Sequence, residues 1–274
     1  ELLIKVQATT VHIGDTKIRS FKPGLGKFQD FLFKPLMRFM IGFSGPRKKI
    51  LGMELAGEIE ATGGKVTLFK PGDKIFAATS MRFGAYAEYT CLPENGVIAT
   101  IPAGMSYAEA APVSNGGITA LRLLKLAKLQ KGQKILIYGA SGSVGTFAVQ
   151  LAKTMGAEVV GVCSTTNMDL VSSLGADKVI DYTREDFSKG PESYDVIFDA
   201  VGKASVSHSK NRLKPGGVYL NVLKSSGGLK LKSAELRFLQ DLMEKGKLIT
   251  VIDKRFPLSQ IVEAHRYVDC AASD

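Results

Sequence analysis

The feature that most constrains this chain is a glycine-rich segment, Gly139–Gly145, between two stretches of different periodicity. The residues before it, Lys134–Tyr138, form a short apolar run typical of a buried strand, and Val144–Met155 carry apolar side chains at helical spacing. A strand, a glycine-rich turn and a helix in this order open the βαβ units that bind dinucleotides. The sequence therefore predicts a parallel sheet with a nucleotide site at one edge.

Each glycine of this loop has its own expected role. Gly139 permits the tight turn, Gly142 lets the backbone approach a pyrophosphate, and Gly145 allows the helix and the strand to pack closely. The free amides at the positive end of the helix are donors for the anion. A tight turn without a ligand is the alternative. We predict that the cofactor is bound by the whole loop, Gly139, Ala140, Ser141, Gly142, Ser143, Val144 and Gly145.

The periodicity along the chain changes near Ser106, which with Glu109 forms a helix-capping pattern. After it, a helix is predicted over 117–129, and strands and helices then alternate in the manner of a doubly wound parallel sheet. The further strands are predicted at 158–163, 178–181, 194–199 and 217–222, with a helix over 168–174 ended by Gly175. In the part of the chain before Ser106, short strands at 2–10, 57–63, 66–69 and 74–78 predict a compact barrel-like domain.

The adenosine half of a dinucleotide is expected at the end of the second strand of the parallel sheet. Sites that prefer NAD place an acid there to bind the ribose hydroxyls. This strand instead ends in Ser164, Thr165 and Thr166, with no acid before Asp169. Because a carboxylate would repel a 2′-phosphate and hydroxyl donors would not, the sequence favours NADPH over NADH. The alternative is that these residues only cap the following helix.

The net charge of +10 suits either a polyanionic ligand or nucleic acid. Nine Lys and Arg residues lie between Thr16 and Ile50, against one acid, Asp30. No nucleic-acid motif accompanies them, so we predict no nucleic-acid partner. Within this region, residues 28–43 interleave cations with large apolar side chains. Three interpretations stay open: a helix that packs on the core, a lid over the substrate, or a membrane-surface patch.

Cysteine use and hydropathy bear on location. The three cysteines lie far apart without a Cys-x-x-Cys pair, which suggests a reducing compartment and argues against a disulfide framework or a zinc ribbon. No apolar run approaches the roughly 18 residues of a membrane span, and no signal peptide is recognised. We therefore expect a cytoplasmic protein.

Several short motifs together resemble the zinc-free quinone oxidoreductase branch of the medium-chain dehydrogenase/reductase superfamily. They are Gly52-Met-Glu-Leu-Ala-Gly57, Phe69-Lys-Pro-Gly-Asp-Lys74, Gly84-Ala-Tyr-Ala-Glu-Tyr89, the glycine-rich loop, Asp199-Ala-Val-Gly202, Lys214-Pro-Gly-Gly217 and 256–267. The resemblance implies an α/β fold with two domains: a GroES-like β-barrel catalytic domain over residues 1–105, to which residues 252–274 return, and a doubly wound Rossmann domain over residues 106–251. It also implies hydride transfer from NADPH, in a cleft between the domains, to a small-molecule quinone or α,β-unsaturated carbonyl.

Departures from the zinc-dependent members bear on the mechanism. Those enzymes hold zinc with a Cys, the His of a Gly-His-Glu motif and a second Cys, whereas this chain has His12, Met53 and Ser114 at the matching positions. A thioether and a hydroxyl are poor zinc ligands. The resemblance therefore implies no metal, and an acceptor that needs little activation. A quinone or an enone meets this condition because conjugation spreads the incoming charge.

His12 stands where many members of the branch have Asn beside the nicotinamide. We predict it as the catalytic group, which hydrogen-bonds the substrate carbonyl and donates a proton. The alternative is a histidine that is simply hydrogen-bonded to backbone or cofactor. The resemblance implies that Thr119 and Tyr182 bind the cofactor. The carboxyl ends of the later strands, where bound cofactor is expected, add Ala200, Val201, Gly202, Asn221 and Val222. The alternative for each of these residues is ordinary packing at a strand end.

Other functions remain to be weighed. One is a nucleotide-binding protein with little turnover, and another is a membrane-surface reductase of long-chain substrates that uses residues 28–43. Relatives usually begin before the counterpart of Leu2 and continue past Tyr267. Between Leu223 and Ala234 they carry a longer loop and a strand used for dimer pairing. We nevertheless expect a homo-oligomer, a dimer.

Overall fold

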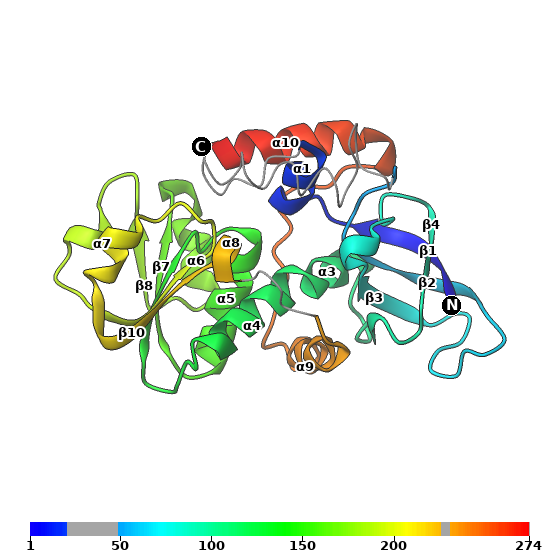
Figure 1. The fold of residues 1–274 in the computed structure, drawn as a ribbon, viewed down its shortest axis with the longest axis horizontal. Coiled ribbons are helices and arrows are strands. Elements are labelled where there is room, and N and C mark those ends of the chain that lie inside the picture. The colour runs from blue at the N-terminus through cyan, green and yellow to red at the C-terminus, as the bar shows by residue number, and fades with distance from the viewer. Residues whose placement is uncertain (21–48, 226–230, 274) are drawn as a thin grey trace. The chain divides into compact units, whose positions relative to one another are not determined.

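The computed structural model describes residues 1–20, 49–225 and 231–273 (Figure 1). The chain divides into two compact units, Glu1–Asn115 with Ile252–Asp274, and Gly116–Val251. The first division falls after Asn115 rather than after Met105, because Ser114 and Asn115 are hydrogen-bonded to β-strand residues of the first unit. The amphipathic stretch 28–43, and with it the choice between lid, packed helix and membrane patch, lies outside the described residues.

The first unit is built on an antiparallel sheet with the strand order β4-β1-β2-β3-β5. Buried apolar side chains from all five strands form its core, among them Leu2, Ile4, Leu55, Ile59 and Ile75. The strands are β1 (Leu2–Thr9), β2 (Glu54–Thr62), β3 (Lys74–Ala78), β4 (Tyr89–Leu92) and β5 (Val97–Thr100). The helical segments are α1 (Ile13–Ser20), η1 (Ser80–Arg82), α3 (Tyr107–Ala110), η2 (Ala111–Ser114), η5 (Leu258–Gln260) and α10 (Ile261–Ser273).

Two features near this sheet test local predictions. The capping box predicted from Ser106 and Glu109 is confirmed at the start of α3. The strand predicted at Val66–Phe69 is wrong, since no strand forms there. The backbone amides of Thr67 and Leu68 donate to the carboxylate of Glu94, both at 2.8 Å, so the amides that a strand partner would need are taken by a side chain.

The second unit contains a parallel sheet with the strand order β10-β9-β6-β7-β8. The strands are β6 (Lys134–Tyr138), β7 (Glu158–Cys163), β8 (Lys178–Asp181), β9 (Tyr194–Asp199) and β10 (Leu213–Asn221). The chain moves outward from β6 in one direction and, from β9, in the other. In doubly wound sheets, nucleotides bind at such a reversal, outside the carboxyl ends of the strands.

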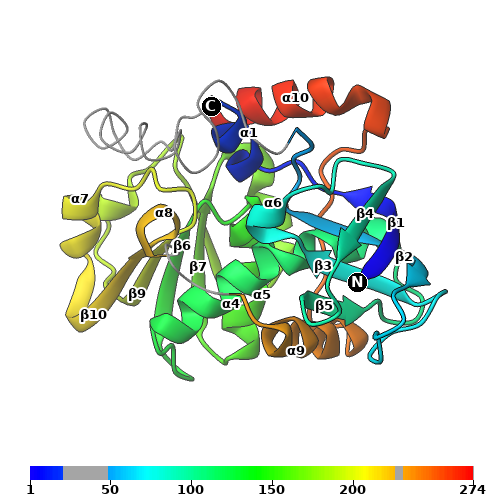
Figure 2. The same ribbon diagram turned by 45° about the vertical axis from the view of Figure 1, so that its right-hand side comes forward.

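Helices cover this sheet, and Figure 2 shows α4 and α5 lying together beside the strands. They are α4 (Gly116–Leu126), α5 (Ser143–Thr154), η3 (Thr165–Asn167), α6 (Met168–Ser173), η4 (Phe187–Lys189), α7 (Val206–Lys210), α8 (Val222–Ser225) and α9 (Ser233–Glu244). Val222, predicted to end a strand, is instead the first residue of α8. The side chain of Asn221 accepts the amides of Leu223 and Lys224 and so begins a helix.

Candidate cofactor-binding site

The glycine-rich loop follows β6 and opens α5, a helix of twelve residues. Gly139 has φ +78°, and a Cβ there would lie 2.5 Å from Cγ1 of Val201. A Cβ on Gly145 would lie 2.1 Å from the carbonyl oxygen of Gly139. Both glycines are therefore required by the packing of the loop itself, before any ligand is considered.

Gly142 differs from these two glycines because the protein does not crowd it. Its nearest neighbour for an added Cβ is the carbonyl oxygen of Gly139 at 3.4 Å, an ordinary contact. It stands at the N-cap of α5 with φ −78° and ψ 172°, a conformation open to any residue. An open backbone surface at the N-terminus of a long helix has the shape and the donors that a pyrophosphate needs.

A buried carboxylate, Asp199, organises the neighbouring strand end. It accepts the backbone amides of Val201, Gly202 and Ala204 at 3.2, 2.7 and 3.0 Å. It also accepts the side-chain amide of Asn221 at 3.0 Å. The predicted residues Ala200–Gly202 and Asn221 are thus gathered by one side chain that sequence reasoning did not select. The available signal was an acid directly after the apolar run Val196–Phe198 at the end of the strand.

The predicted adenosine end lies where β7 and β8 finish side by side. The hydroxyl of Thr165 donates to Asp181 at 2.5 Å, and Thr183 donates to the same carboxylate through its amide and its hydroxyl. Hydrogen bonds from Thr165 and then from Thr183 lower the pKa of Asp181. The Thr165 hydroxyl proton is thereby engaged within the protein. Sequence reasoning missed Asp181 because it ends the third strand, whereas only the second strand was searched for an acid.

The remaining predicted residues of this unit are placed as follows. Tyr182 follows β8, is 45% exposed, and its ring lies 6.4 Å from that of Tyr138. Thr119 is half-buried on α4. The first residue of that helix, Gly116, lies against Ser143 of the loop, 3.1 Å from an added Cβ to the Ser143 hydroxyl oxygen. The start of α4 and the loop are therefore neighbours.

In the first unit, His12 belongs to a partly buried polar cluster just before α1. Its Nδ1 accepts the backbone amide of Gly14 at 3.0 Å. Its Nε2 lies 2.8 Å from the side-chain amide of Asn115 and 3.3 Å from a carboxylate oxygen of Asp15. Glu54 lies close by and accepts the backbone amide of Asn115 at 2.7 Å. His12 is therefore surrounded by polar groups rather than packed in an apolar core.

Glu54 is the most strongly perturbed acid of this cluster. It is 1% exposed, and burial raises its pKa to about 7. The Thr10 hydroxyl donates to it at 2.5 Å, on the opposite carboxylate oxygen from Asn115. Sequence reasoning did not single out Glu54, although it lies in one of the family-like motifs, because its burial depends on the packing of β2 against η2.

Comparisons with known proteins agree with this arrangement. Residues 1–103 match the alcohol dehydrogenase GroES-like domain, and residues 143–250 match the zinc-binding dehydrogenase family. The chain is 34% identical to the chloroplastic quinone-oxidoreductase QR1 of Triphysaria versicolor, over 96% of this chain and 84% of that protein. It belongs to the medium-chain dehydrogenase/reductase superfamily, in its quinone oxidoreductase branch. The chain is therefore an oxidoreductase that uses a nicotinamide cofactor.

Two further relatives extend the comparison. The chain is 31% identical to the chloroplastic NADPH-dependent alkenal/one oxidoreductase of Arabidopsis thaliana, over 98% of this chain and 69% of that protein. The solved quinone oxidoreductase of Coxiella burnetii superposes with a TM-score of 0.81 at 28% identity, over 98% of this chain and 86% of that one. The predicted fold class, a GroES-like domain with a Rossmann domain, is confirmed.

The positions that hold zinc in other members of the superfamily are occupied here by His12, Met53 and Ser114. The Ser114 hydroxyl is fully buried and lies 2.9 and 3.0 Å from the carbonyl oxygens of Ala111 and Ala77. In the part of the chain that the structure describes, no group of three or more His, Cys, Asp or Glu residues could hold a metal ion. Within the same residues, no helix is long and apolar enough to cross a membrane.

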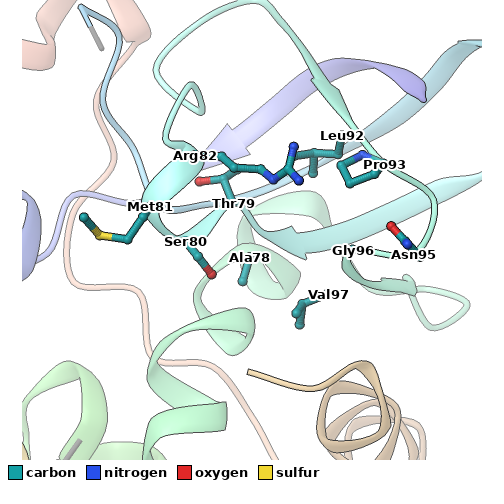
Figure 3. A pocket seen from close by; sticks show the side chains of 10 residues that line it. All are labelled: Ala78, Thr79, Ser80, Met81, Arg82, Leu92, Pro93, Asn95, Gly96 and Val97. Atoms are coloured by element: carbon teal, nitrogen blue, oxygen red, sulfur yellow. The ribbon is translucent and has the colours of Figure 1, made fainter. Parts of the chain in front are cut away.

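Figure 3 shows a pocket of the first unit, and two of its lining residues, Thr79 and Ser80, donate their backbone amides to the carbonyl oxygen of Met53. It is lined by Ala78–Arg82, where β3 passes into η1, and by residues around the turn between β4 and β5. None of the predicted site residues is among those that line it.

Proposed function

We propose that this member of the family reduces quinones or α,β-unsaturated carbonyls with NADPH. The observation that carries the proposal is the loop Gly139–Gly145, in which two glycines are required for packing and a third, Gly142, leaves backbone open at the start of α5. The names of the relatives, a quinone-oxidoreductase and an NADPH-dependent alkenal/one oxidoreductase, support the substrate class and the cofactor.

In this proposal the residues of the second unit hold and orient the cofactor. The amides at the start of α5 bind the pyrophosphate, and the loop organised by Asp199 presents Ala200–Gly202 and Asn221 toward the nicotinamide half. When bound, the reduced nicotinamide would supply a hydride, which is one proton together with two electrons. Rigid placement is the chief contribution of these residues, because hydride transfer needs reacting atoms held about 3–3.5 Å apart.

For the 2′-phosphate, we infer a site made of Ser164, Thr166 and Arg184. Since Thr165 donates to Asp181, its hydroxyl adds no donor. Ser164 and Thr166 share a hydrogen bond at 3.1 Å, so one of their two hydroxyl protons stays free for a phosphate. Arg184 has a side chain 75% exposed, with Nε 3.5 Å from the Asp181 carboxylate. Its guanidinium brings positive charge to the same strand ends, as a phosphate group requires.

Cofactor kinetics with Arg184→Gln tests this proposal. An exposed ion pair is worth about 1 kcal/mol, so KM for NADPH should rise roughly fivefold while KM for NADH stays the same. Lys131→Gln is the control, because Lys131 is an exposed cation before β6, at the opposite end of the strands. An equal effect on both cofactors would exclude Arg184 as the phosphate ligand. NADPH binding without turnover of any quinone or enone would instead support a binding protein.

Zinc independence, the dimer and the cytoplasmic location are further parts of the proposal. Ser114 and Met53 at the zinc positions support a metal-free reaction, and activity that survives extensive chelation would agree with it. Activity lost on chelation and restored by added zinc would contradict it. Sedimentation of the full chain measures the oligomeric state.

A further inference from the structure

His12 is folded back over the residue two positions ahead of it in the chain. A Cβ added to Gly14 would lie 2.7 Å from Cε1 and 2.8 Å from Nδ1 of the imidazole. The ring can take this position only because Gly14 has no side chain. In this arrangement the backbone N–H of Gly14 points at Nδ1, with the two nitrogens 3.0 Å apart.

This contact decides which imidazole nitrogen carries the proton. A backbone N–H can only donate, so Nδ1 must offer a lone pair to Gly14. A neutral imidazole has one lone pair and one N–H, and its proton is therefore on Nε2. The Asn115 amide lies 2.8 Å from Nε2 and can turn by 180°, since its oxygen and nitrogen have similar shapes. Asn115 thus presents its oxygen to the Nε2 proton.

The same geometry disfavours proton donation by His12. An imidazolium would place a second N–H against that of Gly14, with the nitrogens 3.0 Å apart. A neutral imidazole that gave up its Nε2 proton would become an anion beside the Asp15 carboxylate, 3.3 Å away. The ring is therefore arranged to keep its proton and to donate a hydrogen bond. Triosephosphate isomerase uses a neutral histidine as an electrophile in this sense.

We propose that His12 is a neutral hydrogen-bond donor that stabilises the substrate oxygen as it becomes negative, with Gly14 and Asn115 as positioning residues. This inference rests on the proposed function. The hydride adds with its electron pair to the β-carbon of an enone, and the π electrons move to the carbonyl oxygen to form an enolate. The Nε2–H of His12 takes that oxygen as acceptor in place of Asn115. Water then gives a proton to the α-carbon and leaves as hydroxide to the solvent. The enone is thereby reduced by two electrons, the nicotinamide that gave the hydride is oxidised, and His12 ends the reaction unchanged.

The direct test measures the tautomer and does not need activity. The full chain, labelled with ¹⁵N-histidine, has three histidines, and the His12→Asn variant identifies the signals of His12. At pH 7.5 we expect coupling of a proton to Nε2 and a bare Nδ1. A proton on Nδ1 would overturn the proposal, whatever the enzyme reduces. Gly14→Ala should move the ring and change these signals, whereas Gly64→Ala, with no atom within 4 Å of the added Cβ, should leave them alone.

Kinetics with an enone separates donation of a hydrogen bond from donation of a proton. His12→Asn keeps an N–H donor but cannot act as an acid, and it should stay within about tenfold of the parent kcat. His12→Leu has no donor and should lose about 10²–10³-fold in kcat, the usual cost of removing one oxyanion donor. Equal losses in both variants would show that His12 transfers a proton and would overturn the proposal.

The pH dependence of kcat must be interpreted together with the charged groups near His12. Asp15, Glu54 and His265 interact with the charge on the ring. Tyr86 in turn interacts with Asp15, and Arg19 with His265. Glu54 itself titrates near neutral pH, so the profile is compared with that of His12→Asn. A neutral donor predicts the same profile shape for both proteins. If the parent's profile of kcat against pH showed a rise or fall that is missing from the profile of His12→Asn, the inference would be contradicted.

Discussion

Replacing Gly142 by Ala should weaken cofactor binding without destabilising the protein. The added Cβ meets no protein atom closer than 3.4 Å, and the backbone angles suit alanine, so the free energy of unfolding should change by no more than about 0.5 kcal/mol. The Cβ does occupy the surface that a pyrophosphate approaches. Losing one charge-assisted hydrogen bond costs about 1.5–3 kcal/mol, which corresponds to roughly 10- to 100-fold weaker NADPH binding.

Gly145→Ala is the matched variant with the opposite expectation. Its Cβ would lie 2.1 Å from the carbonyl oxygen of Gly139, so the backbone of the loop must shift. Overpacking of this kind costs about 1–3 kcal/mol. A drop of about 2–4 °C in Tm for each kcal/mol is expected for a unit of this size. The two alanine variants therefore separate the packing role of the loop from its binding role.

The assay combines thermal unfolding of the ligand-free protein with calorimetric titration of NADPH. Gly142→Ala should melt with the parent protein and bind weakly, and Gly145→Ala should melt earlier. The reasoning would be refuted if Gly142→Ala bound NADPH as tightly as the parent. The reasoning would also fail if Gly142→Ala lost as much stability as Gly145→Ala. Such a loss would mean that protein atoms already fill the space that the added Cβ of residue 142 needs.

Two further predictions concern buried carboxylates. Because burial raises the pKa of Glu54 from 4.5 to about 7, the folded protein binds one proton more than the unfolded chain between these values. The free energy of unfolding of the first unit should therefore fall by about 3 kcal/mol as the pH rises from 4.5 to 7. Glu54→Gln should remove this slope in urea melts, and an unchanged slope would assign it elsewhere. Asp199→Asn places an amide against the backbone amides of Val201 and Gly202, so it should cost about 1–3 kcal/mol and weaken NADPH binding. If Asp199→Asn kept the parent's free energy of unfolding and its affinity for NADPH, the hydrogen bonds of Asp199 would not organise the loop.

Local signals were sufficient for the glycine-rich loop and the strands around it. The loop reads directly from neighbouring residues, because a tight turn and a close helix–strand approach each demand glycine at one position. The strand predicted at Val66–Phe69 failed for the complementary reason. Glu94, far along the chain, captures the amides of that stretch, and no local pattern announces such a partner.

The acids were missed because their roles depend on which strand ends lie side by side. Asp181 reaches Thr165 only because β8 pairs with β7, and Asp199 reaches Asn221 only because β10 pairs with β9. Glu54 is perturbed because η2 buries it against the sheet. Burial and strand pairing depend on contacts between residues that are far apart in the sequence. The local periodicity of apolar residues does not reveal such contacts.

The conformation of the glycine-rich loop and the fold class are therefore properties of the sequence itself, since both follow from backbone conformation and from apolar spacing over a few residues. The tertiary structure decided how the side chains of the site are used. It committed the Thr165 hydroxyl to Asp181, and it aimed the Gly14 amide at one nitrogen of His12. A hydrogen bond has a direction and uses one proton. Which acceptor receives that proton depends on residues that are brought together only in the folded chain.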